Sequence, residues 1–227
     1  MLVVLVVLAV LLVLMSGAFG AILRRSEGRW RADLLSDCAG RLAASRLGRD
    51  RSGFATLRGR YAGTAVNVRL VPDTLVHRRL PQLWLKVTLR TPLPTGCVLD
   101  VLRRPAGAEF YAPDHLPNRY PVPEAWPPDT LLRGTAGADS LHARLAPVLA
   151  PILADPRVKE VLFTPDGLRL TLQASQGTRG TYLLLRGSRF PIERVSPELF
   201  DGILDAARRL LLALSETDPE TRHACAA

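Results

Sequence analysis

The hydrophobic pattern begins with an unbroken apolar run at the start of the chain. Every residue from Leu2 to Met15 is apolar, and no charged residue appears before Arg24. A helix rises about 1.5 Å per residue, so residues 1–23 would span roughly 34 Å, enough for a hydrocarbon core of about 30 Å. The pattern therefore predicts a transmembrane anchor over residues 1–23.

Basic residues follow this apolar run but do not precede it. Four of them lie close behind it: Arg24, Arg25, Arg29 and Arg31. The positive-inside rule then predicts a single-pass membrane protein with these arginines as the anchor flank and the globular part in the cytoplasm. Cleavage of a signal peptide near Gly20 is the alternative, because Ala18 and Ala21 are also small, and it would leave a periplasmic or secreted chain.

Small residues near the end of the run predict contact between two such helices. Ser16 and Gly20 are four residues apart, as are Gly17 and Ala21. Small residues at this spacing let helices approach closely in lipid. We therefore expect membrane lipid as one partner and a weak homodimer through this helix as another, with ordinary tolerance of small residues as the competing explanation.

After the anchor, the period of the pattern changes from helical to strand-like. Residues 24–50 predict a basic juxtamembrane helix, because Trp30, Leu34, Cys38 and Leu42 recur at helical spacing between residues 29 and 47. Residues 51–111 predict an antiparallel β lobe because apolar and polar residues alternate. Its strands are expected at residues 54–60, 64–71, 83–89 and 97–102.

The second half of the chain begins with a proline-rich stretch. Residues 112–138 contain six prolines between positions 113 and 128, which predicts an extended connector. Residues 139–227 predict an α+β lobe. Its expected elements are a helix capped by Asp139, a hairpin at 158–163 and 168–174, a strand at 181–186 and a helix that begins at Ser196-Pro197-Glu198.

Together these elements predict an α+β fold: an N-terminal transmembrane helix followed by a mainly antiparallel-sheet domain with about three helices. The order of one helix and three strands occurs twice, around 54–90 and around 158–186. It suggests two lobes of similar plan, although the residues do not repeat.

Charge and composition narrow the function classes. Arginine supplies 28 of the 30 basic residues, and the sequence pI is about 10.4. This bias indicates a GC-rich bacterial genome, so the high pI alone does not indicate nucleic-acid binding. The positive excess lies in the first half, where residues 24–60 carry ten arginines against four acids. Such a segment suits anionic headgroups, and an ordinary solvated face explains it equally well.

No stretch of the sequence carries a specific catalytic, nucleotide or metal motif. Cys38, Cys97 and Cys225 are odd in number and widely spaced, which indicates neither a disulfide framework nor a zinc site. We therefore expect no cofactor and no metal.

The remaining candidates are residues that could contact a protein partner. The connector carries Asp114, His115, Tyr120 and Trp126, and Trp84 lies on the basic face of the predicted β lobe. A single tryptophan among arginines is thin support for base stacking, so nucleic acid is not expected. The sequence favours a membrane-anchored, non-enzymatic binding or assembly module. The alternative is a membrane-tethered hydrolase-like enzyme that uses Glu109, Asp114 and His115 for acid and base work.

Overall fold

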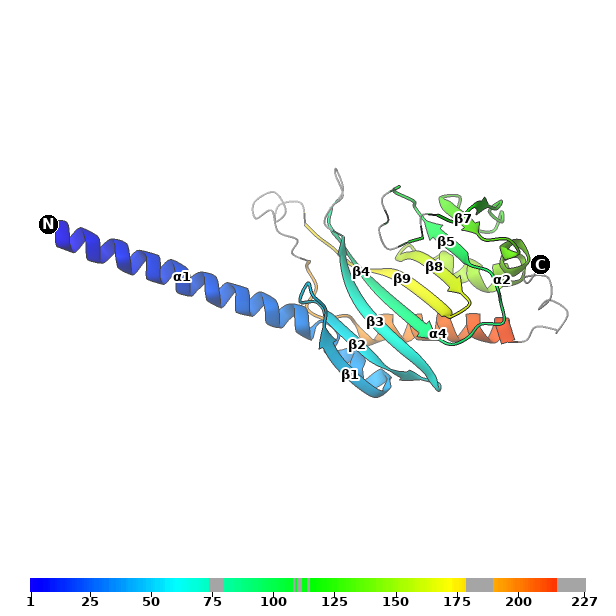
Figure 1. The fold of residues 1–227 in the computed structure, drawn as a ribbon, viewed down its shortest axis with the longest axis horizontal. Coiled ribbons are helices and arrows are strands. Elements are labelled where there is room, and N and C mark those ends of the chain that lie inside the picture. Colours follow the sequence, from blue (N-terminus) through cyan, green and yellow to red (C-terminus); the bar gives the residue numbers. More distant parts are fainter. Residues whose placement is uncertain (74–79, 108, 110–111, 114, 179–189, 216–227) are drawn as a thin grey trace.

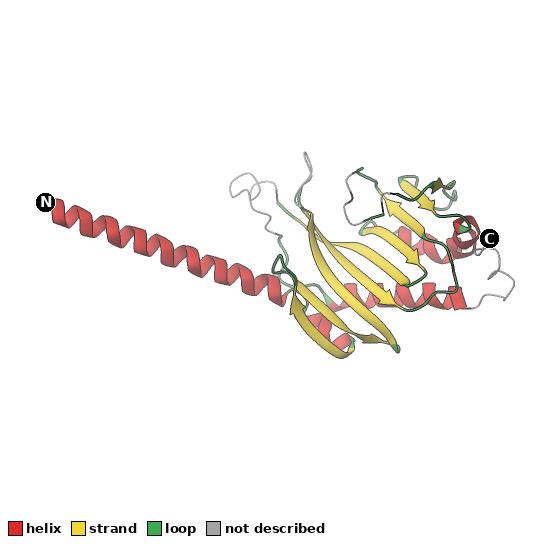
Figure 2. Cartoon of the chain, viewed as in Figure 1, coloured by secondary structure: helices red, strands yellow, loops and turns green. Residues whose placement is uncertain are grey.

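The computed structural model describes residues 1–73, 80–107, 109, 112–113, 115–178 and 190–215, and for residues 2, 3, 5, 6, 9 and 10 it describes the backbone only. In this part of the chain, nine strands form one sheet and the helices of the body pack on one of its faces (Figures 1 and 2).

Every pair of neighbouring strands in the sheet is antiparallel. The strands are β1 (Ala43–Arg49), β2 (Ala55–Tyr61), β3 (Thr64–Asp73), β4 (Gln82–Arg90), β5 (Leu99–Arg103), β6 (Asn118–Arg119), β7 (Thr130–Gly134), β8 (Val158–Thr164) and β9 (Gly167–Gln176). The helices are α1 (Leu2–Asp33), the 3₁₀ helix η1 (Ser36–Arg41), α2 (Ala138–Leu153) and α4 (Pro197–Ser215). Across the sheet the order is β1-β2-β3-β4-β9-β8-β5-β7-β6.

The pairing of β4 with β9 joins the two halves of the chain. It runs from Gln82 opposite Gln176 to Arg90 opposite Gly167, and it aligns core residues such as Val87 and Leu170. Both strands therefore bury their apolar residues on the same side. The predicted fold class is wrong in this respect, because the two lobes that the sequence suggested are parts of one sheet.

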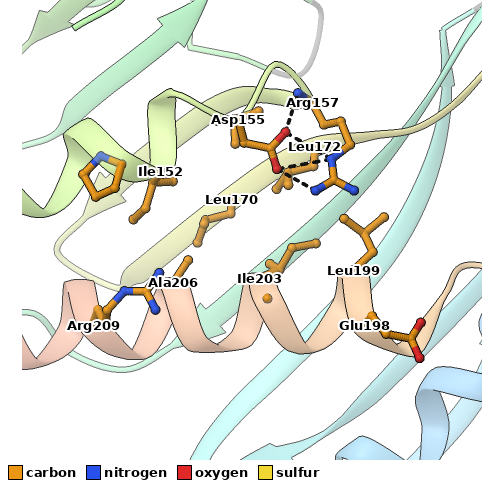
Figure 3. A pocket seen from close by; sticks show the side chains of 13 residues that line it. Ile152, Asp155, Arg157, Leu170, Leu172, Glu198, Leu199, Ile203, Ala206 and Arg209 are labelled. Atoms are coloured by element: carbon orange, nitrogen blue, oxygen red, sulfur yellow. Dashed lines mark hydrogen bonds and ion pairs between the residues drawn. The ribbon is translucent and has the colours of Figure 1, made fainter. Parts of the chain in front are cut away.

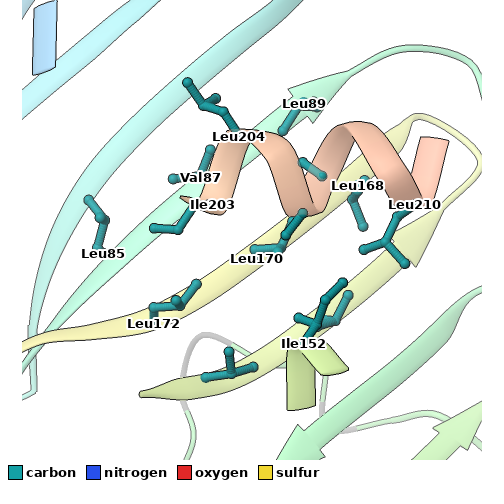
Figure 4. Close-up of a cluster of buried hydrophobic side chains, with 14 of the residues drawn as sticks. Leu85, Val87, Leu89, Ile152, Leu168, Leu170, Leu172, Ile203, Leu204 and Leu210 are labelled. Carbon is teal, nitrogen blue, oxygen red and sulfur yellow. The ribbon is translucent and has the colours of Figure 1, made fainter. Parts of the chain in front are cut away.

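Helices α2 and α4 cover the apolar face of this sheet. In Figure 4, Ile203 and Leu204 of α4 lie over apolar side chains of β4 and β9, among them Val87 and Leu170. These four side chains are at most 2% exposed. A fully buried aliphatic side chain stabilises a fold by roughly 1.5–3 kcal/mol, so this layer contributes much of the stability.

Helix α1 is one continuous element that projects away from the sheet (Figure 1). The apolar run is only its first part, because the helix continues through Arg24, Glu27 and Arg31 to Asp33. In the part of the chain that the structure describes, no helix combines the length and the apolar character needed to cross a membrane. The predicted transmembrane anchor over residues 1–23 is therefore wrong, and so is the single-pass membrane localisation that followed from it.

Two other predicted segments differ from the structure. The helix expected over residues 29–47 ends at Asp33, because Leu34 and Leu35 turn inward to the core, and the chain continues as η1 and then as strand β1. The proline-rich stretch 112–138 includes strand β7, which pairs with β5. Its prolines end at Pro128, before β7 begins, so they do not interrupt the hydrogen bonds between the strands.

Most predicted strands and the last helix are confirmed. The structure has strands at β2, β3, β4, β5 and the hairpin β8–β9, close to the expected bounds. The Leu199 N–H donates to Ser196 Oγ at 3.1 Å, which is the predicted cap of α4. The cap of α2 is Gly137, with φ 80°, instead of Asp139. The strand expected at 181–186 lies outside the described residues.

Gly167 lets the β8–β9 hairpin lie against the end of β4. Its φ is +152°, and a Cβ atom there would lie 2.1 Å from the Leu89 carbonyl oxygen. We expect Gly167→Ala to lower the free energy of unfolding by on the order of 2–3 kcal/mol, measured by urea denaturation. The control is Gly202→Ala, where nothing lies within 4 Å of the added methyl group in α4, and where alanine should stabilise by about 0.5–1 kcal/mol. An equal effect of both changes would contradict the packing described for Gly167.

Candidate binding face of the sheet

The face of the sheet opposite α2 and α4 carries a concentration of basic side chains. We call it the open face and define it by the alternate strand positions that point away from the helix-covered core. Its basic members are Arg46, Arg58, Arg60, Arg69, Lys86, Arg90, Arg133 and Arg169. Cross-strand neighbours in an antiparallel sheet lie about 4.5–5.5 Å apart at Cβ, so the register places Arg46 beside Arg58 and Arg69 beside Lys86.

Two carboxylates are buried beneath this face. Glu160 accepts hydrogen bonds from Arg169 Nε at 3.0 Å and Nη2 at 2.8 Å, and from Thr171 Oγ1 at 2.9 Å. Asp100 accepts from Arg133 Nε at 2.9 Å. Both acids are 0% exposed, whereas the side chains of Arg133 and Arg169 keep 15% and 19% of their surface in contact with solvent. The acids are therefore enclosed, and the arginines form the outer layer.

The pKa of Asp100 is shifted by this enclosure. Burial, and after it the nearby Glu160 charge, raise the pKa to about 7 against the opposing effect of Arg133 and Arg169. Its second oxygen, Oδ1, is buried without a hydrogen-bond partner among the described residues. A proton on Asp100 is therefore favoured at neutral pH more than for an ordinary aspartate.

Lys86 is shifted in the opposite direction. Burial lowers the pKa of its amine to about 8, and the positive charges of Arg169 and Arg69 contribute to the same shift against Glu160. Register places Lys86 between Arg69 on β3 and Thr171 on β9. The lowered pKa therefore reflects mainly the burial of the amine, with the neighbouring arginines as a smaller cause.

Several arginines of the open face have no ion-pair partner among the described residues and are accessible to a binding partner. Within the described residues, no carboxylate lies at ion-pair distance from Arg46, Arg58 or Arg90. All three are exposed. The arrangement can attract and orient anionic groups of a partner, because arginine presents a planar fork of donors that matches a carboxylate.

Most of the described residues that the sequence singled out for a partner make contacts within the fold. Trp126 is 4% exposed and donates from Nε1 to the Ala146 carbonyl, and Trp84 is 7% exposed. Tyr120 is half-buried and donates to the Thr135 carbonyl, while His115 is exposed. Asp114 lies outside the described residues. Partner binding through these five residues stays a prediction.

The four arginines predicted to flank a membrane anchor lie on helix α1. Arg24, Arg25 and Arg29 are exposed along α1. Arg31 instead holds α1 to the body, because it lies 5.0 Å from the centre of the Phe54 ring and its Nη1 donates to the Ser52 carbonyl, while its ion pair with Glu27 lies within α1. Contacts of this helix with lipid or with a second copy stay predictions.

Glu109, a residue of the hydrolase alternative, has a structural partner. Its carboxylate accepts from Lys159 Nζ at 2.9 Å, and the side chains of Lys159 and Glu109 are only 5% and 8% exposed. The Ala106 N–H also donates to it. Glu109 therefore anchors the loop after β5 to strand β8.

Asp100 and Glu160 were not among the functional residues predicted from the sequence. Each lies inside a mostly apolar strand, Asp100 between Leu99 and Val101, and Glu160 between Lys159 and Val161. A single acid in such a strand, with arginines on the neighbouring strands, was the available signal. The role of these acids as partners of arginine becomes clear only from the strand order, which places Asp100 beside Arg133 and Glu160 beside Arg169.

A cleft of about 170 Å³ lies on the helix-covered side, between α2, α4 and the β8–β9 hairpin (Figure 3). Its floor is apolar and includes Ile152, Leu170 and Ile203. Arg157 at its rim binds Asp155, with Nη2 2.8 Å from Oδ2, which holds the pKa of Asp155 below its usual range. This ion pair balances its own charge, so the cleft lacks the excess charge of the open face.

The fold and this face define an antiparallel α+β protein with helices on one side of the sheet and arginines on the other. No known protein family matches the chain, and no curated protein matches it. Among solved structures, it is similar to the crystal structure of the mycobacterial trehalose monomycolate transport factor A, TtfA, with a TM-score of 0.37 and 9% identity over 70% of this chain and 67% of that chain. A likeness at this level carries no functional argument.

The raised pKa of Asp100 predicts a pH-dependent stability. In the unfolded chain the carboxyl group ionises near pH 3.8, but in the folded chain near pH 7. The folded state therefore binds the proton more tightly, and this group lowers the free energy of unfolding as pH rises through that window.

We expect Asp100→Asn, which does not titrate, to lose less stability than the wild type between about pH 4 and about pH 7. Urea denaturation across that range measures the difference. As a second variant, Glu160→Gln removes the neighbouring charge and should move the Asp100 transition to lower pH, seen in carboxyl chemical shifts. Parallel pH profiles for the wild type and Asp100→Asn would show that the Asp100 carboxyl is not perturbed.

Proposed function

We propose that this chain is a non-enzymatic binding module that docks an acidic protein segment on the open face of its sheet. The observation that carries the proposal is the separation of charge: the acids Asp100 and Glu160 are 0% exposed, while basic side chains such as Arg58 and Arg90 are exposed. Complementary charge of this kind speeds association and selects partners.

Burial of the acids also argues against catalysis on this face. A general acid or base must reach the group that it protonates within about 2.6–3.2 Å. Asp100 and Glu160 lie beneath Arg133 and Arg169, which occupy the direction of approach. Their hydrogen bonds explain them as the internal counter-ions of the arginines.

The burial of the Trp84 ring favours a protein partner over single-stranded nucleic acid. Proteins that bind single strands stack bases on exposed aromatic rings beside basic residues. Trp84 is buried, and its indole N–H donates to Asp73 Oδ2 at 3.3 Å. The ring is therefore not offered to a base, and a flexible acidic segment needs only the arginines.

Charge reversal on the open face tests this function. We expect Arg58→Glu with Arg90→Glu to weaken binding of a glutamate-rich peptide by at least about tenfold at low salt, because two favourable charge contacts become repulsive. Fluorescence anisotropy of the labelled peptide measures this change.

The matched control carries the same change of net charge elsewhere. Arg208→Glu with Arg209→Glu reverses two exposed residues of α4, on the other side of the sheet. Binding should stay within about twofold of wild type. Equal losses in both variants would mean that only the total charge matters, and tighter binding of a single-stranded oligonucleotide would favour nucleic acid instead.

Lys86 offers an independent footprint of the docked partner. With its pKa lowered to about 8, a large fraction of its amine is unprotonated at about pH 8, and it should react readily with acetic anhydride. Binding of the acidic peptide should slow this labelling, measured by mass spectrometry.

The chain holds one other lysine, which serves as an internal control. Lys159 donates to Glu109 and to the Arg103 and Arg104 carbonyls at 2.7–2.9 Å, so its reaction should be slow with or without the peptide. Labelling of Lys86 that the peptide does not change would place the partner away from the centre of the open face.

A further inference from the structure

Strand β1 forms one border of the sheet and is exposed along its whole length. All seven of its residues are exposed, and its neighbour in the sheet is β2. Figure 1 shows β1 at the outer edge, beyond β2 and β3. An edge strand presents backbone N–H and C=O groups that an added strand can bind.

Leu47 gives this edge an apolar contact that the fold leaves uncovered. Register places it beside Leu57, which is 0% exposed in the core, yet Leu47 itself is 49% exposed. Apart from Met1 and residues of α1, the large hydrophobic side chains that are exposed in the described part of the chain are Leu47 and Leu212. The helix layer therefore ends before it covers the apolar side of β1.

The other side of β1 carries a charge that lacks a neutralising neighbour. Arg46 lies directly opposite Arg58 on the open face. Like charges that face each other across strands destabilise the pair, and no carboxylate among the described residues lies at ion-pair distance from either arginine. An acid on the far side of β1 would relieve this repulsion.

The same charges disfavour a second copy of this chain as the added strand. Self-pairing of β1 would place Arg46 and Arg49 of one copy near the arginines of the other. A strand that alternates acidic and apolar residues instead satisfies both sides, because successive side chains of a strand point to opposite faces.

We propose that β1 accepts an extended segment of the partner as an added antiparallel strand, with acidic side chains beside Arg46 and apolar side chains over Leu47. The inference rests on the proposed function, because it states how the acidic partner is held. The added strand would extend the open face and bring its acids next to Arg46, with Arg58 one strand further in.

A pair of peptides of equal composition tests the inference on the whole chain. One alternates glutamate with valine, and the other carries the glutamates and the valines in two blocks. We expect the alternating peptide to bind at least about fivefold more tightly, and to slow amide hydrogen exchange within residues 43–49, because its backbone bonds to β1.

Two leucine variants supply the matched comparison. Leu47→Thr keeps the strand propensity but removes the apolar contact, and it should weaken the alternating peptide by roughly fivefold. Leu212→Thr, at the other exposed leucine, should leave the affinity unchanged.

The outcomes separate the inference from the proposed function. Equal binding of both peptides with unchanged exchange in β1 would overturn strand addition, while a loss in the Arg58→Glu and Arg90→Glu variant would still support docking on the open face. Absence of binding by either peptide, or binding that this variant does not weaken, would overturn both.

Discussion

The fold depends on burial of α2 and α4 against one face of a single sheet. Side chains alternate between the two faces of a strand, so the residues that pack on these helices, such as Val87 and Leu170, fix which residues point the other way. The basic open face is therefore a direct consequence of the apolar one. A shift of one residue in the register of β4 and β9 would exchange the two faces.

Electrostatics on the open face are organised in two layers. Arg133 and Arg169 pair with Asp100 and Glu160 below them, so these two pairs add less net charge than unpaired arginines would. The net positive field comes from the side where Arg46 and Arg58 lie, at the edge strand β1. This gradient explains why the charge excess of the first half of the sequence matters after folding, since the first half supplies strands β1 to β4.

Local sequence patterns predicted most helices and strands, whereas the order of the strands in the sheet depends on contacts between residues far apart in the sequence. The alternation around Leu168 to Leu172 and the Ser196-Pro197 start of α4 were readable, because both are local effects. The joining of two halves by β4 and β9 was not, since strand partners far apart in sequence leave no periodic trace. The apolar run at the start predicted a helix correctly, but it did not show that the helix continues to Asp33.

The β4–β9 pairing also bears on how the chain folds during synthesis. Residues 90 and 167 are partners in the sheet but are separated by 77 positions. On the ribosome, which adds about 5–20 residues per second, β4 emerges several seconds before β9 can reach it. During that interval β4 is an unpaired edge strand. Such long-range pairing also slows folding. A nascent chain with this topology is therefore an expected client of chaperones that shield unpaired strands.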